Sequence, residues 1–105
     1  MPQYAVVATH EASQCPGANR TMRDVYQKVV QEAQGLQQKR GVKLALGPVH
    51  LDPAHKILVV AEAASQDTLV DHLMESRLAA IQYLEVYRLT PMEQLLGGTP
   101  PEPLY

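Results

Sequence analysis

The chain has 105 residues, 46% of them hydrophobic, and its nine Lys and Arg residues against eleven Asp and Glu residues give a formal charge of −2, values typical of a single globular domain. No cluster of basic residues interleaves with aromatic residues, which argues against a nucleic-acid partner. The single cysteine excludes an internal disulfide, and the first ten residues become polar too soon for a signal peptide or a membrane span, so we expect a cytoplasmic protein without a membrane partner.

A strand and a long helix are predicted first. Residues 3–9 form an apolar, β-branched run that ends in a polar loop containing Gly and Pro. In residues 19–41, hydrophobic side chains recur at spacings of three and four, which indicates an amphipathic helix. Asn19 or Thr21 can cap the start of this helix, and Gly41 can end it.

A hairpin of two strands follows. The strands are predicted over residues 42–49 and 56–63, both rich in Val and Leu. They are joined by the loop HLDPAH, residues 50–55, which has Asp-Pro at its turn and a histidine at each end. The loop therefore adds two imidazole groups to the end of the hairpin.

A second helix and a fourth strand come next. Ser65 is a suitable N-cap for a helix over residues 66–78. The hydrophobic residues that we expect on the buried side of this helix are Leu69, Val70, Leu73 and Met74. Residues 80–89 alternate well enough to predict a strand.

The last predicted element is a short helix over residues 92–96. Thr90 is the expected N-cap, with the proline after it in the first turn. The tail, residues 97–105, is rich in Gly and Pro and is not expected to add to the core. We therefore predict one domain over residues 1–96, followed by this tail.

The order of elements, βαββαβ, predicts an α+β fold of the ferredoxin-like type, with a four-stranded antiparallel sheet and two helices on one face. The strands at 3–9 and 56–63 would lie at the centre, and both are apolar on both of their faces. A sheet with one face in water normally alternates polar and apolar residues. The helix-free face must therefore be covered, and two sheets packed face to face, a dimeric α/β barrel, would cover each other. We expect a homodimer or a higher homo-oligomer.

Four segments carry a resemblance to a known family: ATHEASQCP after the first strand, HKILVVAEA in the third strand, LMES in the second helix and the closing TPMEQLL. From residue 3 to about residue 96, the chain resembles a little-characterised family of small bacterial and archaeal dimeric α/β-barrel domains with a Thr-His-x4-Cys-Pro motif. The resemblance implies the barrel fold. It implies no single activity, because the wider superfamily includes oxygenases, isomerases, heme enzymes and ligand-binding domains.

Four residues with metal-binding side chains are predicted to meet at one rim of the sheet. His10 ends the first strand and Cys15 precedes the first helix, whereas His50 follows the second strand and His55 precedes the third. Imidazole nitrogens and a thiolate suit zinc, copper or iron, and the positive end of the helix dipole favours the thiolate. We therefore predict a transition-metal site made of His10, Cys15, His50 and His55. In an enzyme, His10 and Cys15 would also be the candidate catalytic residues.

Each of these side chains has a plain structural explanation as well. A lone cysteine often serves as a small apolar side chain. Histidines in a hairpin loop are often merely solvated. The fourth histidine of the chain, His72, is expected on the flank of the second helix and outside the site.

Polar residues on the predicted strands have mainly structural explanations. Glu62 interrupts the apolar third strand at the end away from the histidines, so we expect a structural partner such as Arg88 or a tyrosine of a partner chain. Tyr83, Glu85 and Tyr87 alternate on one face of the last strand. There they would either line the barrel interior or lie at the dimer interface.

Three functions agree with the sequence, and they leave open whether the protein is an enzyme. The first is a metal-binding domain, which would be a metalloenzyme if one coordination position stays open. The second is a metal-free dimeric α/β-barrel protein that binds or transforms a small apolar molecule between sheet and helices, as a monooxygenase or isomerase would, with His10 as a base. The third is a non-catalytic assembly subunit that binds another protein through the tail at 97–105.

Overall fold

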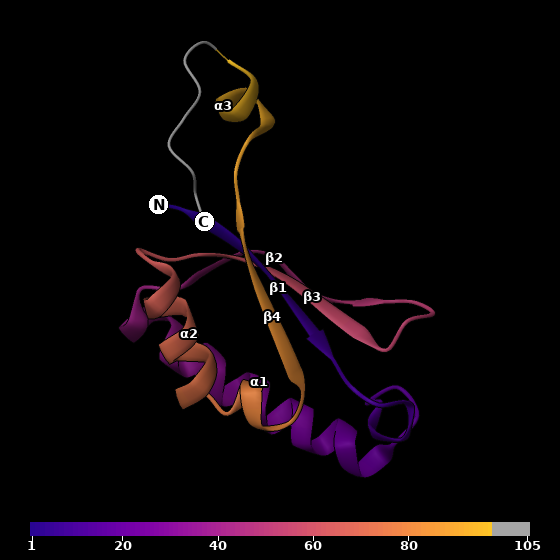
Figure 1. Cartoon of the computed structure of the whole chain (residues 1–105). Helices are drawn as coiled ribbons and strands as arrows, with labels where there is room; N and C mark the ends of the chain where they lie inside the picture. The colour runs from indigo at the N-terminus through magenta and orange to yellow at the C-terminus, as the bar shows by residue number, and fades with distance from the viewer. Residues whose placement is uncertain (98–105) are drawn as a thin grey trace.

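A computed structural model describes residues 1–97, and these residues form one antiparallel sheet with the two longer helices on one face and a short C-terminal helix beyond the end of the last strand (Figure 1). The strand order, β2-β3-β1-β4, confirms the predicted α+β fold of the ferredoxin-like type. In chain order the elements are β1 (Gln3–Thr9), the 3-10 helix η1 (Ala12–Gln14), α1 (Arg20–Arg40), β2 (Lys43–Leu51), β3 (Lys56–Glu62), α2 (Gln66–Glu75), the 3-10 helix η2 (Leu78–Ala80), β4 (Tyr83–Leu89) and α3 (Met92–Leu96). Apart from Gly97, the predicted tail lies outside the described residues.

The hydrophobic core lies between the sheet and the two longer helices. Alternate residues of β1, namely Tyr4, Val6 and Ala8, are buried against the helices. In the register of the sheet they lie opposite Ala61, Val59 and Ile57 of β3, so the central strands present one continuous apolar surface. The buried helix residues that pack on this side are Tyr26, Val29, Ala33, Leu69 and Leu73.

The ends of α1 follow the sequence. The Asn19 side chain accepts a hydrogen bond from the backbone N–H of Met22, which makes Asn19 the N-cap. Gly41 ends the helix in the left-handed conformation, at φ 69°, which glycine adopts without strain. Among residues 1–97, no helix combines the length and the hydrophobicity needed to cross a lipid bilayer.

Three predicted boundaries differ from the structure. Strand β2 continues to Leu51, because its pairing with β3 continues through His50 opposite Ile57, so His50 belongs to the strand and not to the loop. Helix α2 ends at Glu75, since Arg77 takes a left-handed conformation at φ 66°. Strand β4 begins only at residue 83, after η2.

The start of α3 also differs from the prediction. Pro91, and not Thr90, is the N-cap residue, and no side chain caps this helix. A proline suits this position because its nitrogen carries no N–H that would need a partner.

Strand β2 contains two irregularities in its pairing with β3. The first moves the following side chains to the other face of the sheet, and the second moves them back. Leu44 lies opposite Ala61, on the helix side, whereas Leu46 lies opposite Val60, on the other face. The second shift, between Leu46 and Val49, returns His50 to the helix side. Gly47 lies between the two shifts at φ 87°, and a Cβ atom there would lie 2.5 Å from the Leu58 carbonyl oxygen, so this position requires glycine.

The prediction of Arg88 as the partner of Glu62 is wrong, whereas the alternative, a tyrosine of a partner chain, stays a prediction. Glu62 accepts a hydrogen bond of 3.0 Å from the Gln3 side chain, its direct neighbour across β1 and β3. Arg88 pairs with Tyr4 in the sheet and so belongs to the opposite face, which is why it does not reach Glu62.

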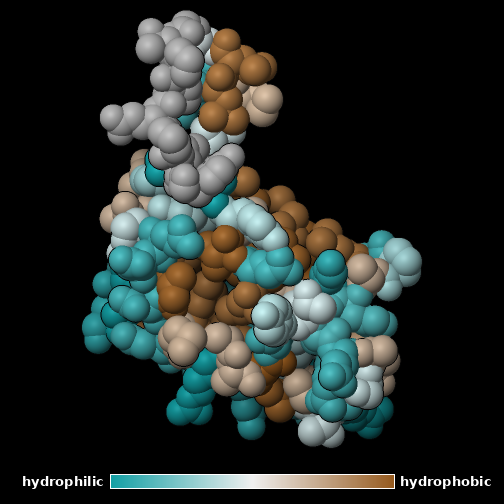
Figure 2. Space-filling model, in the orientation of Figure 1, coloured by the Kyte–Doolittle hydropathy of each residue, from teal (hydrophilic) through white to brown (hydrophobic). Residues whose placement is uncertain are grey.

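The helix-free face of the sheet is mostly apolar. Brown hydrophobic side chains follow its margin in the space-filling view (Figure 2). In the register, this face carries Ala5 and Val7 of β1 and Leu58 and Val60 of β3. The exposed residues on the two edge strands of this face are Leu46, Val49, Tyr83, Tyr87 and Leu89. The predicted homodimer would cover this surface, and its existence stays a prediction.

We predict that replacing Val60 by Asp converts a dimer into a monomer, because the new charge would be buried between two sheets without a partner. Size-exclusion chromatography with light scattering would give the mass of each variant. Val70→Asp, at an exposed position on α2, is the matched control and should leave the dimer intact. A wild-type chain that is monomeric at every concentration tested would contradict the prediction.

Candidate metal centre

The position of His10 is fixed by the central strands. His10 follows β1 directly, and its backbone N–H donates a hydrogen bond of 3.0 Å to the carbonyl oxygen of His55, the residue before β3. This bond continues the ladder in which Thr9 lies opposite Lys56. The antiparallel pairing therefore brings two histidines together that are 45 positions apart in the sequence.

The loop that carries Cys15 is held by the first turn of α1. The Cys15 carbonyl oxygen accepts hydrogen bonds from the backbone N–H groups of Ala18 and Asn19, at 3.0 and 2.8 Å. The Asn19 side chain also donates a hydrogen bond of 2.9 Å to the carbonyl of Ser13. Arg23 donates to the carbonyl of Pro16 at 3.0 Å. The loop is thus attached at several points on either side of the cysteine.

The structure brings all four predicted metal-binding side chains together at one end of the sheet. One ligand atom each from His10, Cys15 and His55 lie within 4.8 Å of one another. The Cys15 Sγ lies 3.9 Å from Nε2 of His50. The ring centre of His10 is 5.4 Å from that of His50 and 5.6 Å from that of His55. Their role as ligands or catalytic residues is still a prediction.

These separations are close to those of a metal site. Zn–N distances of about 2.1 Å and Zn–S distances of about 2.3 Å place neighbouring ligand atoms of a tetrahedral site roughly 3.5 Å apart. The three atoms within 4.8 Å would therefore need to approach by about 1 Å, which side-chain rotation can supply. His10 and Cys15 are buried, whereas His50 and His55 are exposed. The cluster thus has a closed inner side and an outer side open to solvent.

His10 has no hydrogen-bond partner on either ring nitrogen among residues 1–97, although only 5% of its surface is exposed. A buried polar group without a partner costs on the order of 1–3 kcal/mol. Burial, and then the nearby His50 and His55, lower the pKa of His10, so the ring is neutral at pH 7 and offers a free lone pair. A neutral imidazole is the form that binds a metal.

Asp52 supports the orientation of His50. Its carboxylate oxygen Oδ1 lies 2.8 Å from Nδ1 of His50, which leaves Nε2 free on the side of Cys15. Histidine ligands commonly hold a carboxylate on their second nitrogen in this way. The sequence predicted only a turn at Asp52. The spacing of a histidine and an aspartate two residues apart at a strand end is the signal that could have indicated more.

Tyr26 is a further neighbour that the sequence did not identify. Its ring lies edge-on to His10, with 6.1 Å between the ring centres. Its hydroxyl donates a hydrogen bond of 3.0 Å to the side-chain oxygen of Gln82. Burial, and then Cys15, raise the pKa of Tyr26, so the phenol stays protonated at neutral pH.

His72, which we expected on the flank of the second helix, lies on its inner face and is buried at 3% exposure. The prediction placed Val70 and Met74 on the inner side, and both are exposed. The buried residues of α2 and its C-cap are Leu69, His72, Leu73 and Ser76, so the true inner face is rotated relative to the predicted one. His72 is not part of the metal-binding cluster.

Comparison with models of known protein families gives no match, and comparison with curated proteins gives none either. Membership in the dimeric α/β-barrel family with the Thr-His-x4-Cys-Pro motif stays a prediction from the sequence.

Replacing Asn19 by Ala should lower the free energy of unfolding by about 1 kcal/mol, because the N-cap bond of α1 is lost. Urea unfolding followed by circular dichroism would measure this change. Asn19→Asp is the control, because a carboxylate oxygen can still cap the helix but cannot donate to the Ser13 carbonyl, and it should recover part of the loss. Equal stability of wild type and Asn19→Ala would show that the cap contributes nothing.

His72 should make the protein less stable in acid. Burial, and then Arg40 of α1, lower the pKa of His72 below its ordinary value of 6.5, and Arg40 is itself paired with Glu75 of α2. Below that ordinary value the unfolded chain binds the proton more readily than the folded chain, so the free energy of unfolding falls as the pH falls.

His72→Leu should reduce this loss. Urea unfolding of wild type and variant at about pH 7.5 and about pH 5 would compare the two losses. His10 titrates in the same direction and is present in both proteins, so it cancels in the comparison. An identical loss in both would contradict the prediction.

Proposed function

We propose that this protein binds a transition-metal ion through His10, Cys15 and His55, with His50 beside them as a fourth donor. The observation that carries the proposal is the buried imidazole of His10, which has no partner among residues 1–97 and lies within 4.8 Å of a thiol and a second imidazole. A metal ion would satisfy one of its nitrogens and repay part of the cost of burial.

The donor atoms limit the identity of the metal. Two or three imidazole nitrogens with one thiolate suit zinc, copper or iron better than calcium or magnesium, which prefer oxygen ligands. The sequence alone predicted the same three metals. Their order of affinity is expected to favour copper(II) over zinc when both are offered equally.

The arrangement of the donors favours an open site. Three ligand atoms, from His10, Cys15 and His55, form the compact group, and two of the four donor residues are exposed to solvent. Three protein ligands with a fourth position open to water or substrate describe a catalytic metal site, whereas four protein ligands describe a structural one. His50, hydrogen-bonded to Asp52, would decide between the two, because it either joins the metal or stays beside it.

The test is a titration of the metal-free protein, without a histidine tag, with cobalt(II). A cobalt–thiolate bond gives a charge-transfer band in the near ultraviolet, so the spectrum reports Cys15 directly. One ion should bind per chain in the wild type. Cys15→Ser should lose the band, and His10→Ala should lose most of the affinity. Asp52→Asn distinguishes the two arrangements: it should weaken binding by about 10- to 100-fold where His50 is a ligand, and leave binding unchanged where His50 stays beside the metal.

His72→Gln is the control, because it removes a buried histidine outside the cluster and should bind cobalt as the wild type does. Circular dichroism would verify that each variant is folded. Cobalt binding that is unchanged in both Cys15→Ser and His10→Ala would overturn the proposal, as would the absence of stoichiometric binding in the wild type.

A further inference from the structure

A cavity of about 300 Å³ lies between the sheet and α1, and α2 and η2 close one side of it. In the space-filling view, hydrophobic side chains line a hollow between α2 and the sheet (Figure 2). The cavity exists because small side chains face it from three elements, Ala8 on β1, Ala33 on α1 and Ala61 on β3. Larger side chains at these positions would fill the space, so the cavity results from the choice of alanine at these three positions.

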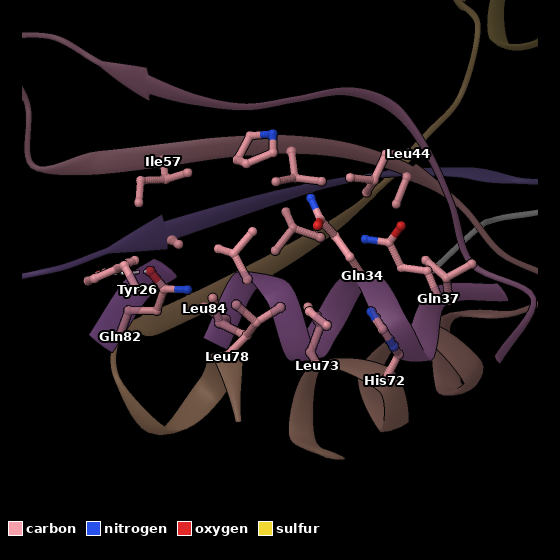
Figure 3. Close-up of a pocket in the computed structure, with 18 of the residues that line it drawn as sticks. Tyr26, Gln34, Gln37, Leu44, Ile57, His72, Leu73, Leu78, Gln82 and Leu84 are labelled. Atoms are coloured by element: carbon pink, nitrogen blue, oxygen red, sulfur yellow. Dashed lines mark hydrogen bonds between the residues drawn. The ribbon is translucent and has the colours of Figure 1, made fainter. Parts of the chain in front are cut away.

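Polar side chains lie toward the two ends of this cavity, the Gln34 side chain of α1 reaches between the ends, and most of the remaining lining is apolar. Figure 3 shows Tyr26 and Gln82 near Ile57 at one end. The close-up also shows Gln37 near Leu44 at the other end, where the Gln37 side chain rises from α1 toward the sheet. A molecule that fills the cavity would thus contact mostly hydrocarbon along its length, with the Gln34 amide beside it, and hydrogen-bonding groups at its ends.

The walls favour an uncharged occupant. None of the residues that line the cavity in the described part of the chain is Asp, Glu, Lys or Arg. His72, a titratable group in the walls, is neutral at pH 7, because burial and then Arg40 lower its pKa. A charged ligand would lose its hydration without gaining a counter-charge.

His72 gives a second, independent indication of a ligand. It lines the cavity at 3% exposure, and its Nδ1 atom has no hydrogen-bond partner among residues 1–97. Figure 3 shows its ring rising from α2 toward α1. A hydroxyl or carbonyl group on a bound molecule could supply the missing hydrogen bond.

We propose that the cavity is a binding site for an uncharged, largely hydrophobic molecule of about two rings, with one hydroxyl or carbonyl group that bonds His72. The size follows from volume, because a cavity of about 150 Å³ binds benzene and this one is about twice as large. The site does not depend on the proposed metal. It adjoins the metal centre, however, since Pro16, the residue after Cys15, and His50 both line the cavity.

The experiment compares three probes on the metal-free protein: 1-naphthol, naphthalene and 1-naphthoate. The chain has no tryptophan, so probe fluorescence is read without that background. We expect 1-naphthol to bind once per chain, naphthalene to bind about fivefold more weakly because one hydrogen bond is missing, and 1-naphthoate to bind at least about tenfold more weakly because its charge is buried without a partner. Equal affinity for all three probes would overturn the proposal.

Two variants fill the cavity from opposite walls, Ala33→Leu and Ala61→Leu. Each should weaken 1-naphthol binding by at least about tenfold, because the added side chain occupies the ligand volume. Ala45→Leu, at an exposed position on β2 outside the cavity, is the matched control and should bind as the wild type does. His72→Leu should remove the preference for 1-naphthol over naphthalene. Unchanged binding in folded Ala33→Leu and Ala61→Leu would contradict the proposal.

A measurement on the wild type keeps the test decisive if the filled variants do not fold. Methyl NMR shifts on adding 1-naphthol should be confined to cavity residues such as Val30, Leu44 and Leu73. Shifts confined instead to Leu46 and Leu58 would place the probe on the helix-free face and overturn the proposal. The two proposals fail separately, because 1-naphthol binding is measured without metal and cobalt binding without 1-naphthol.

Discussion

The antiparallel pairing of β1 with β3 is the constraint on which the candidate site depends. It aligns Thr9 with Lys56 and lets the backbone of His10 bond to that of His55, so two imidazoles are brought together by main-chain hydrogen bonds alone. The same pairing sets Tyr4, Val6 and Ala8 against the helices and so builds the wall of the core. Cys15 joins the histidines because the first turn of α1 holds its loop. The pairing of β1 with β3 therefore sets the core and the His10–His55 pair, while the loop before α1 adds the thiol.

Much of this arrangement could be predicted from the sequence, because it rests on chain order and local patterns. The order of strands and helices left few topologies, and the ferredoxin-like one sends His10, Cys15, His50 and His55 to one rim. The N-cap at Asn19 and the glycine that ends α1 could also be predicted, because each acts on its immediate neighbours in the chain. These features require no knowledge of packing between distant segments.

The remaining features depend on packing and could not be predicted. The burial of His72 follows from the rotation of α2 about its own axis, and Val70 and Met74 are hydrophobic enough to suggest the wrong face. The partner of Glu62 depends on strand register, which puts Gln3 beside it and Arg88 on the opposite face. A site for a small apolar molecule between sheet and helices was one of the three functions left open by the sequence, but the walls of the cavity arise where small residues from separate elements meet, and no single segment shows this.

The paired irregularities of β2 have a consequence for how this chain can change in length. From Leu44 to Leu51 the strand takes seven steps, whereas its partner takes five from Ala61 to Lys56, so β2 carries two extra residues. Deleting both extra residues would leave every later side chain of β2 on the same face of the sheet, because strand side chains alternate between faces with a period of two residues. Deleting only one would move these side chains to the opposite face and turn the His50 ring away from Cys15. In related chains that keep the His50 ring beside the cysteine, the length of β2 before this histidine should therefore differ only by even numbers of residues. An alignment of such chains would test this rule.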